Sequence, residues 1–235
     1  MIMFSSVTDA KKTIDTLKET LKRDDGCSDF EVFSLIDGLQ QVFETVVAVN
    51  KQHTILTGDE ISDIGEQALS MIDNLVYKLM DNDLASHKFE VEQVAMFLAN
   101  WIIKHKGKLS KIQSVVDGLA DMANQVEDKV SLLQLSTFMS QVAHACSDVI
   151  QHDLDITDPG RPWRALNMNR GIVATRTHDL DIMREVFHDL IKAIPMDAPA
   201  FFKEGMSEME RLNYPEPVQE LMQEFYNQTQ KPVVH

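Results

Sequence analysis

The chain has 235 residues, 44% of them hydrophobic and 25% charged, and its formal net charge is −15. This is the composition of a globular protein that is long enough to bury a sizeable core without covalent staples. The excess of acidic residues argues against general binding to nucleic acid, which depends on neutralising phosphates with lysine and arginine.

The cysteines and the apolar runs exclude further classes of protein. Cys27 and Cys146 are the two cysteines, and their spacing fits neither a disulfide framework nor a thiolate metal site. Cys146 falls on an apolar stripe and is expected to be buried. The N-terminal residues lack a signal-peptide pattern, and the best apolar run, residues 94–103, is too short to cross a bilayer. We therefore expect a cytoplasmic protein without membrane contact and without a cofactor.

Apolar residues recur every three or four positions along most of the chain, which is the period of the α-helix. In chain order the spacing predicts a weak first helix before residue 28 and then helices over 28–50, 59–79, 86–106, 110–126, 128–150, from 162, 180–194, 197–212 and 214–225. No stretch alternates in the manner of a strand. The sequence predicts an all-α protein of about nine or ten helices, packed as antiparallel pairs in an irregular bundle or a short α-solenoid.

Helix ends can be read from capping residues. Ser28 and Glu31 match a capping box, and Asp179 is a suitable N-cap for the helix that follows it. His105 lies in the last turn of its helix, so we expect a C-terminal capping role rather than a catalytic one. Gly107 is expected to supply the left-handed residue that ends this helix.

The predicted helices change character along the chain. Long helices fill residues 1–152, and shorter helices punctuated by proline fill residues 153–235. We expect two lobes that form one continuous domain. We leave open whether residues 1–28 are mobile, and we expect the tail from Gln228 to be an extended or loosely docked arm.

One basic stretch interrupts the acidic chain. Between Thr157 and Arg184 there are five arginines against three aspartates. Arginine is favoured where a planar group must meet a carboxylate or phosphate at two points. Pro162 suits the first turn of a helix, whose free N–H groups attract an anion. The candidate binding residues for an anion or an acidic partner are Arg161, Trp163, Arg164, Arg170 and Arg176.

A structural role for these arginines is the alternative, in which they pair with carboxylates of neighbouring helices. We expect at least two of Arg161, Arg164 and Arg170 to meet a carboxylate or an anion, and the local helix to begin within three residues of Pro162. Trp163 would either stack on a ligand or anchor the helix.

A metal site is a second alternative. His144, Asp148 and His152 are spaced to share a helix face, and histidine with carboxylate at this spacing can hold a metal ion. Together with His178 and Asp179 they would suit a metal-dependent hydrolase of the His-Asp class, although its flanking pattern is not recognisable. A solvent-exposed polar stripe is the competing interpretation. No phosphate-binding loop and no nucleophile elbow is present in the sequence.

The segment DPGRPWRALNMNRGIVATRTHD, followed by APAFFKEGM and YPEPV, resembles a family of uncharacterised bacterial all-helical proteins over residues 158–225. The resemblance implies no activity, substrate or catalytic residue.

These observations favour a non-enzymatic cytoplasmic interaction or scaffold protein. Its arginine-rich segment would bind an acidic protein partner or a second copy of the chain. A sensor of a small anion, held by the same arginines, and the metal-dependent hydrolase are the alternatives.

Overall fold

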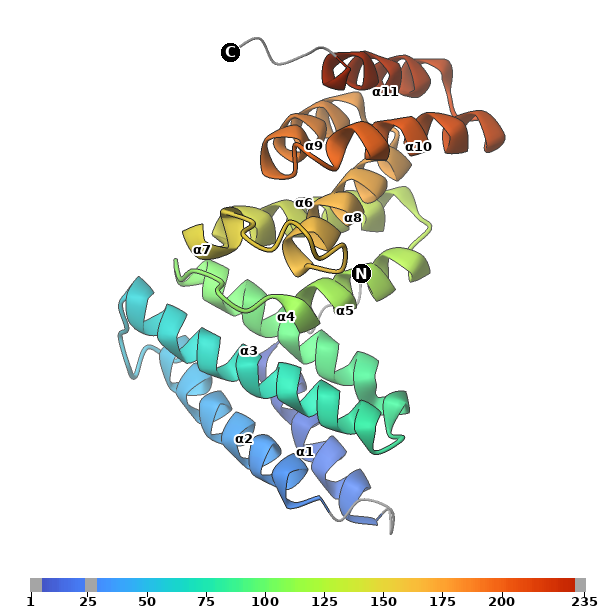
Figure 1. Ribbon diagram of the computed structural model, residues 1–235. Helices are drawn as coiled ribbons and strands as arrows, with labels where there is room; N and C mark the ends of the chain where they lie inside the picture. The colour runs from blue at the N-terminus through green and yellow to red at the C-terminus, as the bar shows by residue number, and fades with distance from the viewer. Residues whose placement is uncertain (1–5, 24–28, 231–235) are drawn as a thin grey trace. The chain divides into compact units, whose positions relative to one another are not determined.

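The computed structural model describes residues 6–23 and 29–230, and these residues form eleven α-helices and one short 3-10 helix (Figure 1). They contain no strand beyond an isolated bridge between Leu109 and Cys146, so the predicted all-α class is confirmed. The α-helices are α1 Val7–Arg23, α2 Phe30–Asn50, α3 Gly58–Asp81, α4 Lys88–Lys104, α5 Gln113–Gln125, α6 Lys129–Ala145, α7 Asp148–Gln151, α8 Pro162–Thr177, α9 Leu180–Ala193, α10 Ala198–Arg211 and α11 Glu216–Thr229.

The chain packs as two compact units. The first comprises residues up to 124 together with 144–147, and the second comprises 125–143 and 148–235. The division predicted from the sequence lay at residue 152, whereas most of α6 belongs with the later helices. The reason is local packing, because Arg170 of α8 donates to Ser140 of α6 and Arg176 donates to the carbonyl oxygen of Val126.

In the first unit, even the polar first helix is packed. Ala10, Ile14, Leu17 and Leu21 of α1 are buried, as their spacing of three and four requires. The predicted capping residue Ser28 lies outside the described part of the chain. Of the tail expected to be extended or loosely docked from Gln228, residues 228 and 229 belong to α11 instead, and residues 231–235 lie outside the described part. The N-cap of α2 is Asp29, whose carboxylate accepts a hydrogen bond from the backbone N–H of Glu31.

Helix α2 is long and apolar enough to cross a membrane by length and composition, which corrects the expectation that no segment qualifies. A core helix of a folded unit passes the same test. One face of α2 is buried beside α1 and α3. Its acidic side chains pair with lysines of the same two helices, in the pairs Lys11–Glu44, Lys18–Asp37 and Lys78–Glu31.

The end of α4 confirms one prediction and corrects another. His105 is the C-cap residue, with its backbone N–H 3.1 Å from the carbonyl oxygen of Trp101. The left-handed residue is Lys106, at φ 62°, and not Gly107. A Cβ atom on Gly107 would lie 2.8 Å from side-chain carbons of Ile61 and Ile102. Glycine is therefore required here by close packing rather than by backbone conformation.

The helix predicted over 128–150 is interrupted. Helix α6 ends at Ala145 and α7 begins at Asp148. Between them the backbone pairs with Leu109, whose N–H donates to Ala145 (2.9 Å) and whose carbonyl oxygen accepts from Ser147 (2.8 Å). These bonds replace the helical hydrogen bonds. The apolar spacing of the sequence continues across this point although the helix itself is broken. Cys146 is fully buried at this bridge, as expected.

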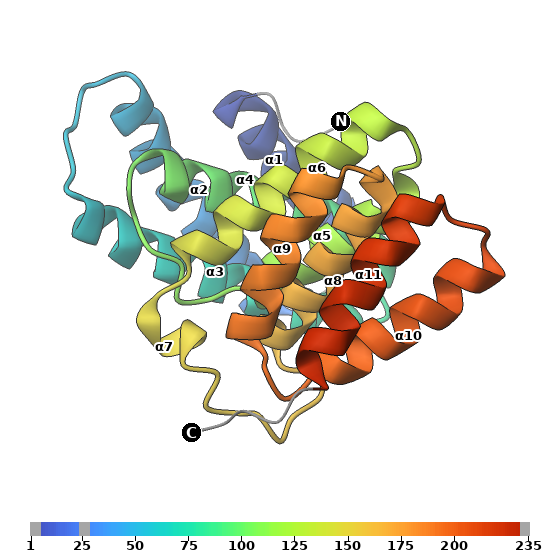
Figure 2. The same ribbon diagram turned by 90° about the horizontal axis from the view of Figure 1, so that it is seen from above.

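In the second unit, helices α9, α10 and α11 meet around phenylalanine rings. Phe187 of α9 lies 5.1–6.1 Å, between ring centroids, from Phe201 and Phe202 of α10 and Phe225 of α11, in edge-to-face geometry. Figure 2 shows α10 and α11 side by side. Asp179 is the N-cap of α9 and accepts from the N–H groups of Asp181 and Ile182, as predicted.

Candidate functional site

Arg161 is the first arginine of the predicted basic stretch. Its side chain is buried, and its Nε and Nη2 atoms donate to the two carboxylate oxygens of Asp153 at 2.6 and 2.9 Å. Nη2 also donates to Asp197 at 2.7 Å, and Nη1 donates to the carbonyl oxygen of Asp158 at 2.9 Å. The two-point contact with Asp153 is the geometry that distinguishes arginine from lysine. The acceptors come from the chain itself.

Arg164 shares one of these acceptors. Its Nε atom donates to Asp197 at 2.7 Å, and Nη1 donates to the carbonyl oxygen of Pro159 at 3.0 Å. Asp197 stands at the N-cap position of α10 but does not cap that helix. Burial alone would raise the pKa of this carboxyl, yet the hydrogen bonds from Arg164 and Arg161 lower its pKa below the ordinary value.

Arg170 is the most deeply buried of the four. Its Nη2 atom donates to Asp189 of α9 and to Ser140 of α6, each at 3.1 Å, and Nη1 donates to Asn167 at 3.2 Å. Its Nε atom has no acceptor within the described residues. Arg170 therefore links three helices through a buried charge.

The remaining two candidates are also engaged. Arg176 donates to the carbonyl oxygen of Val126. Trp163 is buried, and its indole N–H donates to the carbonyl oxygen of Ala193 at 3.2 Å. The indole thus has the position of a helix anchor.

Two of the expectations for this stretch are confirmed. Helix α8 begins at Pro162, and Arg161, Arg164 and Arg170 all meet carboxylates of the chain. The carboxylates that Arg161 and Arg164 meet belong to Asp153 and Asp197. This arrangement favours the structural alternative, and binding of an external anion at these arginines stays a prediction.

The residues of the alternative metal site are not gathered. Helix α6 ends at Ala145 and α7 begins at Asp148, so His144, Asp148 and His152 do not share the face of one continuous helix. His178 packs its ring 4.9 Å from that of Tyr214, and Asp179 caps α9. Among the described residues, no group of three or more His, Cys, Asp and Glu side chains could hold a metal ion. The hydrolase alternative receives no geometric support.

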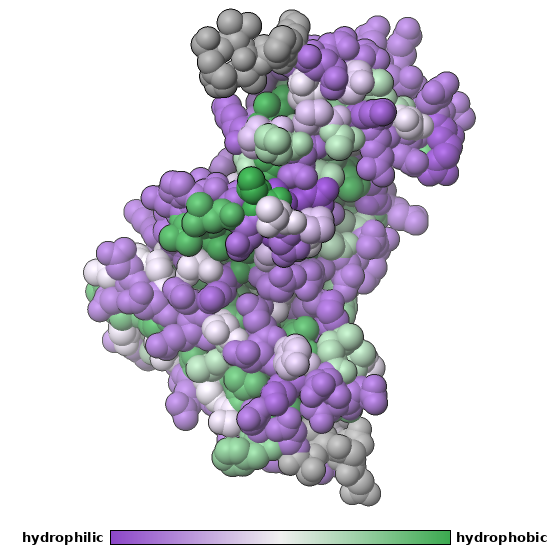
Figure 3. Space-filling model, in the orientation of Figure 1, coloured by the Kyte–Doolittle hydropathy of each residue, from purple (hydrophilic) through white to green (hydrophobic). Residues whose placement is uncertain are grey.

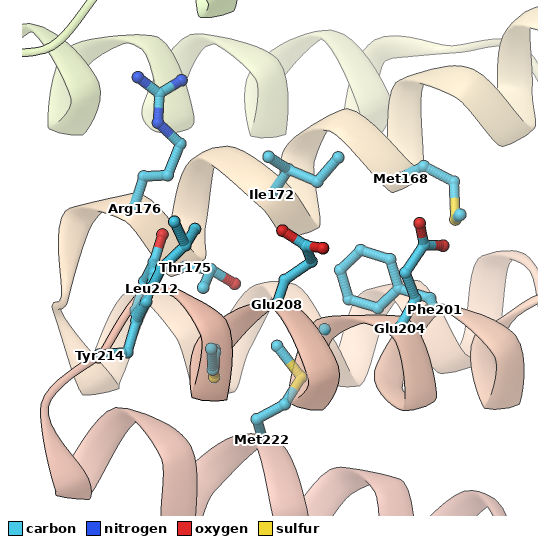
Figure 4. A pocket seen from close by; sticks show the side chains of 12 residues that line it. Met168, Ile172, Thr175, Arg176, Phe201, Glu204, Glu208, Leu212, Tyr214 and Met222 are labelled. Carbon is cyan, nitrogen blue, oxygen red and sulfur yellow. The ribbon is translucent and has the colours of Figure 1, made fainter.

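A groove that the sequence did not indicate lies within the second unit, between α8, α10 and α11. It encloses about 380 Å³ (Figure 4). Apolar side chains make up most of its lining, namely Met168, Ile172, Phe201, Met209, Leu212 and Met222. Methionine is flexible and polarisable, and it is frequent at surfaces that adapt to a bound partner.

Two glycines shape the groove. A Cβ atom on Gly171 of α8 would lie 2.4 Å from the Phe201 ring, so glycine allows the aromatic wall of α10 to approach the α8 backbone. A Cβ atom on Gly205 would lie 2.8 Å from the methyl group of Met222. Glycine at position 205 thus leaves room for Met222 on the floor of the groove.

The rim of the groove is both apolar and acidic. Ile172 and Leu212 are 48% and 52% exposed, although both are large apolar residues. Glu204 and Glu208 extend from α10 toward α8, whereas Arg176 turns its guanidinium away from them (Figure 4). Glu208 pairs with Arg211, and no partner of Glu204 is seen within the described residues.

Sequence reasoning missed this groove because the methionines have the spacing of core residues. Met209 and Met222 are indeed buried, and both also belong to the lining of the groove. The available signal was a glycine in the middle of each of α8 and α10, since such a residue costs about 1 kcal/mol relative to alanine and usually has a packing reason.

Comparison of the chain with protein-family models, with curated proteins and with solved structures finds no match. The resemblance noted over residues 158–225 therefore stays a prediction.

Proposed function

We propose that the chain is a non-enzymatic helical interaction protein and that the groove between α8, α10 and α11 binds a helical segment of a protein partner. The observation that carries the proposal is an apolar, methionine-lined groove whose apolar rim is left exposed. A groove of this kind is the usual receptor for an amphipathic helix.

A helix is the occupant that the walls allow. The three walls are helices, whose backbone N–H and C=O groups are already bonded along each helix. An extended peptide would find no free backbone edge with which to pair, and its own polar groups would be buried unsatisfied. A helix satisfies its own backbone and offers only side chains to the groove.

The size of the apolar surface favours a helix over a small molecule. A partner helix can lie along the groove and also cover the exposed parts of Ile172 and Leu212 on its rim. From Met168 to Arg176 the groove follows α8 for about 12 Å, at 1.5 Å per residue. This length matches about two turns of a partner helix, with apolar anchors at positions i, i+3 or i+4, and i+7.

The arginine stretch supports this function indirectly. Arg161 and Arg164 start α8, and both bind Asp197 at the start of α10. Two walls of the groove are therefore fastened together at one end by charge-assisted hydrogen bonds. A rigid groove loses less conformational entropy on binding than a flexible one.

The test uses methyl groups as reporters. Protein labelled at the methionine methyls is titrated with helical peptides of about 18 residues, or five turns, which carry leucine and phenylalanine on one face and glutamine on the other. We expect saturable shifts of the Met168 and Met222 signals. I172Q/L212Q should abolish the shifts, because it makes the rim polar without removing buried side chains.

The matched control addresses a second apolar patch. Figure 3 shows apolar side chains gathered over the segment that carries α7, where Val149 and Leu154 are 73% and 78% exposed. V149Q/L154Q should leave peptide binding unchanged. The proposal is wrong if no peptide binds, if binding survives I172Q/L212Q, or if it is lost in V149Q/L154Q.

A further inference from the structure

We infer that the partner helix is cationic, with lysine or arginine beside its apolar stripe at positions that face Glu204 and Glu208. This inference rests on the proposed function, since it specifies the occupant of the same groove. It follows from the placement of the two carboxylates on the groove rim.

The two glutamates stand in an arrangement that the helix itself does not favour. They are four residues apart on α10, so their side chains lie on one face, and like charges at this spacing destabilise a helix. Both belong to the lining of an otherwise apolar groove, and both extend from α10 toward α8 (Figure 4). A cation from a partner would turn this repulsion into two attractive contacts.

The nearby cations leave these carboxylates available. Arg211 pairs with Glu208, but both side chains are at least half exposed, and such pairs are easily exchanged. Arg176, the one basic residue that lines the groove, donates to the carbonyl oxygen of Val126 and points away from the glutamates.

The wider charge of this region has the same sign. From Glu185 to Gln228 the chain has nine acidic and three basic residues. An acidic surface attracts a cationic segment over a distance of about 10 Å at moderate salt and disfavours an acidic one. Groove chemistry and surrounding charge therefore select the same class of partner.

The test compares three peptides that share one apolar stripe. At the two positions beside the stripe they carry lysine, glutamine or glutamate, and their affinities are measured by fluorescence anisotropy. We expect the lysine peptide to bind about tenfold more tightly than the glutamine peptide at low salt, since each exposed ion pair is worth up to about fivefold. The glutamate peptide should bind most weakly.

Variants assign the effect to the rim. E204Q/E208Q should reduce the lysine preference to less than about twofold, and E204K/E208K should reverse it. The control E210Q/E220Q removes two exposed acids outside the groove lining and should keep the full preference.

Each remaining outcome is decisive. Equal affinity for the three peptides, with loss of binding in I172Q/L212Q, would overturn the cationic partner and leave the proposed function standing. A lysine preference that persists in E204Q/E208Q would also overturn the inference. Binding of none of the peptides would remove the proposed function and the inference together.

Discussion

Each of the two units buries a charge, and the surroundings of these charges differ. In the second unit, Arg161 meets two carboxylates and a carbonyl oxygen. In the first unit, Glu92 of α4 is fully buried and has Lys88 as its ion-pair partner. Neither carboxylate oxygen of Glu92 accepts a well-formed hydrogen bond from the described residues. One charge is embedded in a network, and the other depends on a single flexible lysine.

The pKa values of two carboxyl groups, the buried Glu92 and the partly buried Asp197, show whether burial or the neighbouring cations dominate in each unit. Burial, helped by the carboxylates of Asp117 and Asp121 on α5, outweighs the lowering by Lys88 and raises the pKa of Glu92 to about 7. Burial acts in the same direction on Asp197, but two arginines reverse the outcome and lower its pKa. The number of donors that reach a buried carboxylate therefore decides whether it is ionised at neutral pH.

The largest expected effect comes from breaking the network. Arg161→Met should lower the free energy of unfolding of the second unit by about 4 kcal/mol, because it leaves the partly buried Asp153 without its two-point donor and Asp197 with Arg164 alone. Urea unfolding can be followed by the fluorescence of Trp163 in a Trp101→Phe background, since the chain has two tryptophans. A loss below about 1 kcal/mol would show that the network contributes little.

Replacing Glu92 should have the opposite effect and raise the free energy of unfolding of the first unit. The pKa of Glu92 is higher in the folded chain than the ordinary 4.5, so its contribution to stability is full below pH 4.5 and is lost as the pH rises to about 7. Glu92→Gln should therefore stabilise the first unit at pH 8 by up to about 3 kcal/mol, and by little at pH 4.5. Unfolding at both pH values, with Trp101 as reporter and Trp163→Phe as background, checks this. Equal effects at the two pH values would mean that Glu92 does not titrate in this range.

The smallest effect is expected where a charge of the network is partly exposed. Arg164→Ala removes one of two arginines from Asp197 and should cost about 1–3 kcal/mol. Arg164→Lys should recover only part of this loss, because lysine cannot reach Asp197 and the Pro159 carbonyl in the same planar geometry. If Arg164→Ala leaves the urea midpoint unchanged and weakens binding of an acidic peptide instead, the external-anion interpretation of this stretch gains support.

Helix positions were largely predictable because periodicity and caps act locally. The start of α8 at Pro162 and the cap at Asp179 depend on residues within one turn. The break after Ala145 was not predictable, since it depends on pairing with Leu109, which is 36 positions away in the numbering. The same dependence on distant residues applies to the arginines and their acceptors. A cluster of arginines is visible in the sequence, but their acceptors, Asp189 and Asp197, were not assignable without the fold.

The groove was the hardest feature to foresee. Ile172 and Met209 have the same apolar character and the same helical spacing, yet one is half exposed and the other is buried. Within the second unit Phe201 of α10 approaches the backbone of α8 so closely that a Cβ atom on Gly171 would lie 2.4 Å from its ring. No local pattern encodes that approach.

The return of residues 144–147 to the first unit has a consequence for synthesis. As the chain leaves the ribosome, residues 125–143 emerge before the segment that completes the Leu109–Cys146 bridge. The N-terminal unit therefore cannot finish folding until part of its successor has already been made. Nascent chains arrested just after residue 124 should lack this closure, and the two units should gain protease resistance over overlapping windows of chain length rather than strictly one after the other.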